Sequence, residues 1–360
     1  MKRKIFFPPV GIAHITSDLS DLFKYRITDK ELVVINTSAQ PNSVPHLGTV
    51  TTIMVAFAVA ELIRRKLNLN VLVQFDQLEN APAETIEINN VLYSKSLENS
   101  YINNETKLER NMKSFKEVLD MISSLSNVDY EIRSYRTFQQ NIHLRKALTE
   151  ILQNKDEFAQ LLNPSKGTLH VRTECSKCKL VDKKCVHTNY NSNENCIIIE
   201  SYCPIHGNYQ VVFSVDNDTY LDVNTQLRDL LKGVVINKED QANNCLTVML
   251  DGGDWSGTWS QRIHCEGLMK LAHSQVPIRL FAPMILDWSG AKLSKSLYIT
   301  DTSYFANSVA FTNWKDFNST YGIKGIEILW NEVKNWADSP KKFFRNYSVD
   351  YLEELLEASN

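Results

Sequence analysis

The chain has 360 residues, of which 43% are hydrophobic, and it carries a net charge of −3 at pH 7. This length predicts two or three domains of ordinary size, with enough apolar residues for a sizeable core. The slightly negative charge excludes a global positive field that would draw the protein onto nucleic acid, although a local basic patch is compatible with it.

The first elements in chain order predict a doubly wound α/β fold. Residues 32–35, Leu-Val-Val-Ile, form the continuous apolar run of a buried parallel strand. Residues 50–66 have apolar positions at helical spacing and end in Arg-Arg-Lys, which suits the negative end of a helix dipole. Residues 71–75, Val-Leu-Val-Gln-Phe, predict the next strand. This β-α-β unit opens a doubly wound parallel sheet.

The rest of the chain continues this alternation and then becomes helical. Residues 300–360 are rich in aromatic residues and are expected to be mostly helical. Helices are also predicted over 104–123, 140–162 and 258–273, and strands over 129–132, 247–250 and 280–286.

The termini and the cysteine content indicate the compartment. The apolar stretch Phe6–Pro9 after the basic N-terminus is too short for a signal peptide. No apolar stretch approaches the roughly 20 residues that we expect of a membrane span. We therefore expect a cytoplasmic protein without membrane contact, whose seven cysteines are reduced or bind metal rather than form disulfides. The sequence does not indicate an oligomeric state.

The segment 166–215 holds five of these cysteines and is interpreted as a metal-bearing insertion. Cys175-Ser-Lys-Cys178 and Cys203-Pro-Ile-His206 each offer two ligands from a tight turn, the pattern of a tetrahedral zinc site. Four protein ligands leave no open position, so the zinc would be structural. Unligated cysteines are the alternative reading. Three more candidates lie between the pairs, as alternates or a partial second site: Cys185, His187 and Cys196.

Two short motifs far apart in the sequence carry the functional signal. Pro45-His46-Leu47-Gly48-Thr49 follows the first strand and opens the first helix. Lys292-Leu293-Ser294-Lys295-Ser296 lies in a loop after the apolar run 280–286. A histidine and a glycine at a strand-to-helix turn, matched by two lysines on a loop, suit the binding of ATP while its phosphates leave.

The two motifs resemble the HIGH and KMSKS signatures of class I aminoacyl-tRNA synthetases. Their order, spacing and strand contexts agree with that family as well. The sequence is most similar to the class I lysyl-tRNA synthetases, which also have Pro-His-Ile-Gly at the first motif and a cysteine-rich insert between the two. The resemblance covers roughly residues 30–300 and is thin outside the motifs.

This resemblance implies a Rossmann-like catalytic domain with a zinc-ribbon insertion and a short helical C-terminal region. An amino acid and ATP with Mg²⁺ would give an aminoacyl-adenylate and pyrophosphate, and the amino acid would then pass to the acceptor end of a tRNA. Because few residues follow the second motif in this sequence, we expect it to lack the family's full anticodon-recognising region. The expected division is catalytic residues 1–165 and 216–300, zinc-binding residues 166–215, and a C-terminal stem at 301–360.

Several residues acquire roles in ATP binding from this resemblance. His46 would donate to phosphate oxygens, Gly48 would let the nucleotide approach the backbone, and Thr49 replaces the second histidine. Lys292 and Lys295 would neutralise the pyrophosphate. The remaining predicted contacts to ATP are Pro45, Ser294, and the ribose-binding pair Gly252 and Asp254.

The amino-acid pocket is expected beside the ends of three strands. Asp76 follows a predicted strand and could bind the α-amine or merely cap a helix. Other candidates for this pocket are Asn36, Ser38, Gln40, Trp255 and His264. Ser38, Gln40 and Ser43 stand where the lysyl family has glycines, so side chains fill space that the family leaves open. The sequence therefore predicts a preferred amino acid other than lysine, such as a lysine derivative or another polar or basic amino acid.

Three alternatives remain at this stage. A stand-alone paralogue could transfer the amino acid to an acceptor other than tRNA. A nucleotidylyltransferase of the same superfamily could act on a different carboxylate or phosphate. A degenerate, non-catalytic synthetase fold could serve in binding or regulation, although the intact motif residues argue against decay.

Overall fold

The computed structural model describes residues 18–193, 196–257, 262–293 and 309–358. Its centre is a five-stranded sheet in the spatial order β15-β14-β1-β2-β7, and every neighbouring pair is parallel. The strands are β1 (Leu32–Ala39), β2 (Asn70–Gln77), β7 (Tyr130–Ser134), β14 (Cys245–Gly252) and β15 (Ile278–Ala282). The chain leaves the centre in one direction and then returns to build the other half. This is the doubly wound order, and it confirms the predicted fold class.

Helix α1 (Leu47–Leu67) covers one face of the sheet. Val33 and Ile35 of β1 and Phe75 of β2 belong to the same apolar core as this helix. The first turn contains Gly48, and Arg64, Arg65 and Lys66 occupy the last turn. The helix is followed by Asn68 in the left-handed conformation, which is a common way for a helix to end. The predicted β-α-β unit is therefore present, with longer elements than the sequence indicated.

The expectation that no segment would be long and apolar enough to cross a membrane was wrong for α1. By length and composition this helix qualifies, with a mean hydropathy of 1.6 over an 18-residue window. The same window is 72% buried inside the protein, between the sheet and helix α10 (Trp314–Asp338). Its apolar character is thus explained by its position in the core.

Helix α6 (Thr225–Ala242), which the sequence analysis did not predict, lies on the opposite face. Successive residues of a strand point to opposite faces. Phe75 is in the core with α1, whereas the next residue, Asp76, contacts Lys232 of α6. Helix α6 also packs against β14 and belongs to a second apolar core.

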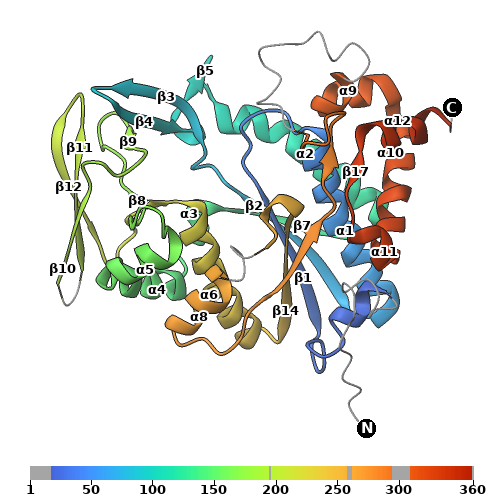
Figure 1. The fold of residues 1–360 in the computed structure, drawn as a ribbon, viewed down its shortest axis with the longest axis horizontal. Helices are drawn as coiled ribbons and strands as arrows, with labels where there is room; N and C mark the ends of the chain where they lie inside the picture. The colour runs from blue at the N-terminus through green and yellow to red at the C-terminus, as the bar shows by residue number, and fades with distance from the viewer. Residues whose placement is uncertain (1–17, 194–195, 258–261, 294–308, 359–360) are drawn as a thin grey trace.

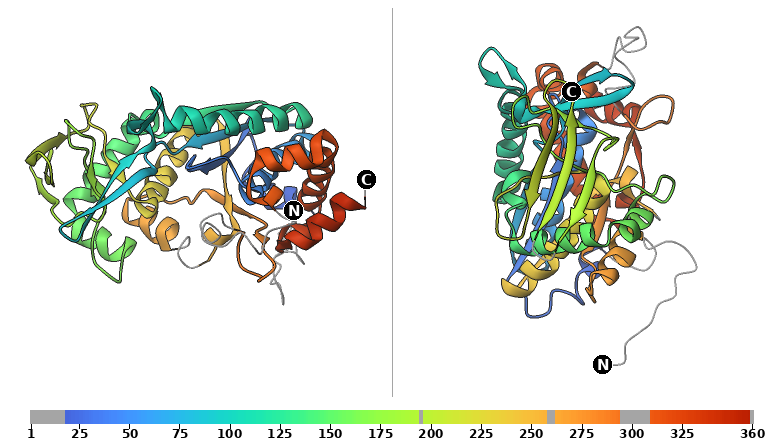
Figure 2. Two further views of the ribbon diagram at one scale, coloured as in Figure 1. Left: turned by 90° about the horizontal axis from the view of Figure 1, so that it is seen from above. Right: turned by 90° about the vertical axis from the view of Figure 1, so that its left-hand side faces the viewer.

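The insertion and the C-terminal helices lie at opposite ends of the molecule, with the sheet between them (Figures 1 and 2). The insertion contains a three-stranded antiparallel sheet, β10-β11-β12. The whole insertion has five strands in the described residues, which are β8 (Val171–Arg172), β9 (Val181–Asp182), β10 (Asn189–Ser192), β11 (Ile197–Cys203) and β12 (Gly207–Phe213). Strand β9 pairs with β4 (Val91–Ser96), and β8 pairs with β13 (Asp222–Val223), so the insertion is joined to the rest by strand pairing.

Several predicted elements differ from those observed. The helix expected over 140–162 is divided at Asn154, whose backbone is not helical. The helix expected over 258–273 is a π-helical turn (Arg262–Glu266) followed by α8 (Gly267–Lys270), and residues 258–261 lie outside the described part. The hairpin β3 (Pro82–Ile88) to β4 was not predicted.

The other helices and short elements are as follows. The helices are α2 (Lys107–Ser126), α3 (Tyr135–Phe138), α4 (Ile142–Gln153), α5 (Lys155–Leu162), α9 (Val309–Thr312), α11 (Pro340–Phe343) and α12 (Val349–Glu357), and the short strands are β5 (Tyr101–Ile102), β6 (Glu105–Thr106), β16 (Ile285–Leu286) and β17 (Tyr347–Ser348). The described residues 309–358 of the C-terminal region are therefore mostly helical, as predicted, and residues 300–308 and 359–360 lie outside the described part.

Candidate active site

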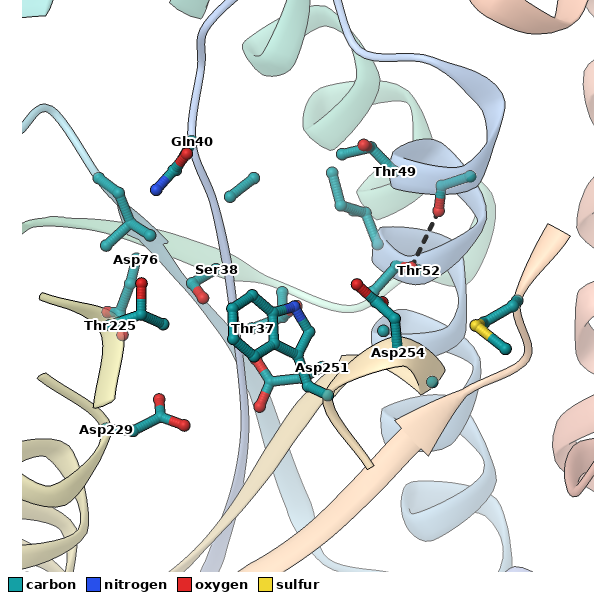
Figure 3. A pocket seen from close by; sticks show the side chains of 18 of the residues that line it. Thr37, Ser38, Gln40, Thr49, Thr52, Asp76, Thr225, Asp229, Asp251 and Asp254 are labelled. Atoms are coloured by element: carbon teal, nitrogen blue, oxygen red, sulfur yellow. Dashed lines mark hydrogen bonds between the residues drawn. The ribbon is translucent and has the colours of Figure 1, made fainter. Parts of the chain in front are cut away.

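A cavity of about 480 Å³ opens at the carboxyl edge of the parallel sheet. It lies beside β1 and β14, where the strand order reverses, which is where doubly wound folds bind ligands. Its walls come from the ends of these strands, the first turn of α1, one face of α6 and the segment after β15. Figure 3 shows Thr49 and Asp254 on one side of the cavity and Asp76, Thr225 and Asp229 on the other.

The first sequence motif forms one wall of this cavity. His46 is the N-terminal capping residue of α1, in an extended conformation and without a side-chain capping bond. The hydroxyl of Thr49 lies 3.2 Å from Nε2 of His46. A Cβ atom on Gly48 would lie 3.0 Å from Cε1 of His46, a tight contact from which the imidazole would have to shift. With no acidic residue in the first turn, its backbone N–H groups suit an anion.

The second motif reaches the same cavity from the other half of the sheet. Nζ of Lys292 lies 2.6 Å from Oδ2 of Asp254. Leu293 is 1% exposed and donates its N–H to the carbonyl of Ile285, so it anchors the start of the loop as expected. The predicted residues Ser294 and Lys295 lie outside the described residues.

Gly252 and Asp254 lie together, as a ribose site would require. A Cβ on Gly252 would come within 2.7 Å of Oδ1 of Asp254. The pair between Lys292 and Asp254 is 46% and 30% exposed, so water screens it and it stabilises the fold little. Either side chain can therefore exchange this partner for a ligand at small cost.

The amino-acid candidates divide into those that line the cavity and those that do not. Ser38, Gln40, Asp76 and Trp255 line it. Asn36 lies behind Asp76 and donates to its Oδ2 at 3.1 Å. The structure brings together most of the predicted ATP and amino-acid residues; the lining ones are Ser38, Gln40, His46, Gly48, Thr49, Asp76, Gly252, Asp254, Trp255 and Lys292. Pro45 is not among them, and its carbonyl accepts from the N–H of Trp314.

Asp76 is already paired with two cations. Lys232 lies 2.9 Å and Arg133 lies 2.8 Å from its carboxylate oxygens. Burial alone would raise the pKa of Asp76, but the two cations outweigh it and lower the pKa to about 2. The carboxylate is thus ionised, and a substrate amine would have to compete with Lys232 and Arg133 for it.

His264 lies behind the cavity wall and not in it. It is 1% exposed, and its ring lies against Gly233 of α6, where a Cβ would come within 3.1 Å of Nδ1. Burial, helped by nearby Arg279, lowers the pKa of His264 to about 3, so the imidazole is neutral. Its position beside α6 favours a packing role over contact with the amino acid.

The sequence analysis missed the polar face of α6. Thr225, Arg228, Asp229 and Lys232 all line the cavity. They follow the spacing i, i+3, i+4 and i+7, which places them on one side of a helix. This spacing was the available signal, because the four polar residues alternate at helical spacing with the apolar Leu227, Leu230 and Leu231.

The four predicted metal ligands meet in the insertion. One ligand atom each from Cys175, Cys178, Cys203 and His206 lies within 4.8 Å of the others, and Sγ of Cys175 is 3.4 Å from Nδ1 of His206. Lys179 and Gly207 have positive φ directly after the two pairs, which closes the tight turns. Three cysteine sulfurs and one imidazole within this distance of one another are a ligand set that fits a zinc ion. The alternates Cys185, His187 and Cys196 are not part of this group.

Comparisons with known proteins give similarity in structure only. No protein-family model and no curated protein matches this sequence. Among solved structures, the chain is similar to an arginyl-tRNA synthetase from Campylobacter jejuni, with 10% identity over 93% of this chain and 70% of that one, and a TM-score of 0.39. A glutamate tRNA ligase from Elizabethkingia meningosepticum shares 12% identity over 90% of this chain and 68% of that one, with a TM-score of 0.42. A glutamate-tRNA synthetase from Elizabethkingia anophelis shares 11% identity over 90% of this chain and 70% of that one, also with a TM-score of 0.42.

Proposed function

We propose that this protein activates an amino acid with ATP in the manner of a class I aminoacyl-tRNA synthetase. The products would be an aminoacyl-adenylate and pyrophosphate. One observation carries the proposal: two motifs far apart in the sequence line a single cavity at the switch point of a doubly wound sheet. His46 and Gly48 lie at the start of α1, and Lys292 lies beside Asp254 at the end of β14.

The reaction needs positioning and charge stabilisation rather than a covalent enzyme intermediate. The amino-acid carboxylate would attack the α-phosphorus of ATP, the bond between the α-phosphorus and the oxygen that bridges to the β-phosphate would break, and pyrophosphate would leave. The imidazole of His46, the hydroxyl of Thr49 and the N–H groups of α1 would donate to phosphate oxygens. Lys292, released from Asp254, would bind the departing pyrophosphate together with Lys295. Asp254 would then be available to the ribose hydroxyls, across the space that Gly252 leaves open.

Transfer to an anionic acceptor is supported by a second cavity of about 390 Å³. It shares Gln40, Thr225 and Arg228 with the first cavity and continues toward the insertion. Lys166 and Lys183 line it without an ion pair among the described residues. We propose that the acceptor is the 3′ end of a tRNA. We further propose that structural zinc at the Cys₃His group holds the insertion in place, and that the protein works in the cytoplasm.

The test is ATP–pyrophosphate exchange with a panel of amino acids, with and without tRNA. We expect one amino acid to support exchange, and His46→Ala and Lys295→Ala each to slow it by roughly 10²–10³-fold. His143→Ala and Lys324→Ala are matched controls outside the cavity and should leave the rate unchanged. Absence of exchange with every amino acid would overturn the proposal. If the protein catalyses exchange but charges no tRNA, the acceptor is a molecule of another class and the proposal of tRNA as acceptor is wrong.

A further inference from the structure

The groups around Asp76 and Thr225 include more cations than carboxylates. The side chains of Arg133 and Lys232 are 13% and 7% exposed. Arg228 is 9% exposed, measured over the whole residue. Arg133 and Lys232 share the carboxylate of Asp76. Glu239, 37% exposed, is 3.8 Å from Arg133. Three cations therefore face two carboxylates, and the surplus cation is Arg228.

Arg228 has few of the partners that a buried guanidinium requires, apart from the ring of Tyr135, whose centre lies 5.7 Å from its Cζ. A guanidinium carries five N–H donors, and the one side-chain hydrogen bond it makes among the described residues goes to the Thr225 hydroxyl at 3.3 Å. No carboxylate of the described part lies within 4.0 Å of it. Asp222, which lines the second cavity beside it, is held by Arg172 at 2.8 Å and by Asn80 at 2.7 Å.

A second cluster, between α6 and β14, has the opposite balance. Asp229 and Asp251 both line the cavity, and both bind the single guanidinium of Arg279. His264 lies 3.9 Å from Asp229 but is neutral, so it does not offset the second carboxylate. One negative charge is therefore left over, next to Gly252 and the nucleotide side of the cavity.

Burying an unpaired charge is costly, so each of these two clusters is suited to a ligand group of opposite sign. We propose that the substrate is an amino acid with an anionic side chain, whose side-chain carboxylate binds Arg228 and whose α-ammonium binds Asp229 and Asp251. Its α-carboxylate then points toward Gly252 and Asp254, where the nucleotide would lie. This inference rests on the proposed function and narrows it to aspartate, glutamate and their analogues.

The same arrangement disfavours lysine. A lysine bound with its α-carboxylate toward the nucleotide has two ammonium groups, and only one of them can use the cluster of Asp229 and Asp251. The other would lie beside Arg228 and Lys232 and be repelled. The basic substrates that the sequence left open are disfavoured for the same reason.

The experiment has two independent readouts. Exchange kinetics with glutamate, aspartate, glutamine, asparagine and lysine should give an acidic amino acid the highest kcat/KM, by at least 100-fold over its own amide. Calorimetric titration of the same compounds without ATP should show binding of that acidic amino acid alone. Arg228→Gln should raise its KM at least 50-fold, leave the KM for ATP unchanged and lower the ratio of acid to amide. The control Arg136→Gln, whose guanidinium pairs with Glu98 and does not line the cavity, should change neither.

The outcomes separate this inference from the proposed function. If lysine or a neutral amino acid supports the fastest exchange, the inference is overturned while amino-acid activation stands. If an acidic amino acid binds but no amino acid supports exchange, the pocket assignment stands and the activity does not. If no amino acid binds and none supports exchange, both the inference and the proposed function are overturned. If Arg228→Gln slows only the transfer to tRNA and leaves exchange intact, Arg228 contacts the acceptor. The assignment of the substrate's side-chain carboxylate to Arg228 is then wrong.

Discussion

Replacing Asp76 by asparagine removes the one carboxylate that Lys232 and Arg133 share. Lys232 is buried and Arg133 is largely shielded from solvent, with its side chain 13% exposed, and the substitution would leave both beside a neutral amide. Breaking a buried ion pair from one side costs about 3–5 kcal/mol, because the remaining charge is uncompensated. We therefore expect Asp76→Asn to lower the free energy of unfolding by about that amount, measured by urea denaturation with circular dichroism.

The pH dependence gives a second estimate of the same interaction. The pKa of Asp76 falls from 3.8 to about 2 in the folded protein, because Lys232 and Arg133 outweigh the cost of burial. A lowered pKa stabilises the folded state above the unfolded pKa, by about 2 kcal/mol here. That contribution is lost as the pH falls from about 4 to about 2. The difference in stability between wild type and Asp76→Asn should shrink over the same range.

Two variants decide whether the reasoning holds. Asp338→Asn removes the partner of Arg65 in a pair that is 44% and 50% exposed, and it should cost less than about 1 kcal/mol. Adding Lys232→Met to Asp76→Asn should restore at least about 1 kcal/mol, because one buried cation goes with its partner. If Asp76→Asn costs no more than Asp338→Asn, the network at the end of β2 is not the buried ion pair described here.

Three further predictions concern the other parts of the molecule. Metal analysis should give about one zinc per chain, and Cys175→Ala combined with Cys203→Ala should abolish binding, whereas Cys265→Ala should retain it; full zinc in the double variant would refute the ligand set. Gly48→Ala should slow exchange because its Cβ displaces the His46 imidazole, while stability stays equal or rises by up to about 1 kcal/mol; unchanged exchange would contradict this. Lys292→Ala should slow exchange at least 10-fold with no measurable loss of stability, since its pair with Asp254 is exposed; a large loss of stability would show a structural role instead.

The strands of the central sheet could be predicted because burial on both faces leaves a continuous apolar run. Residues 32–35 and 71–75 carry that pattern, and both fall within parallel strands of the expected sheet. The two motifs could be placed because Pro45 lies in the segment after β1, which ends at Ala39, and Lys292 lies in the segment after β15, which ends at Ala282. The hairpin β3–β4 was missed, although Asn89 and Asn90 at its turn both have positive φ, and two asparagines between alternating residues favour such a turn.

The candidate site was harder to predict because distance along the chain says little about which face of an element a residue occupies. His264 follows Asp254 closely in sequence, yet it packs behind α6 against Gly233. Arg228 lies in a segment for which no element was predicted at all, yet it lines both cavities. Lys232 lies one turn further along the same helix and determines which groups can approach Asp76.

The charge balance of the pocket is a property of three-dimensional pairing and not of composition. The sequence near Asp76 contains few acidic residues, which argued against lysine but did not indicate what replaces it. The structure adds that Asp76 is neutralised from two other elements, β7 through Arg133 and α6 through Lys232. Once those pairs are formed, Arg228 is the cation left without a carboxylate among the described residues, and Arg279 is the cation shared by two carboxylates. A substrate that carries an ammonium near its reacting carboxylate can pair that ammonium with Asp229 and Asp251, and a second carboxylate farther away can pair with Arg228. A ligand with a single charged group could compensate only one of the two clusters.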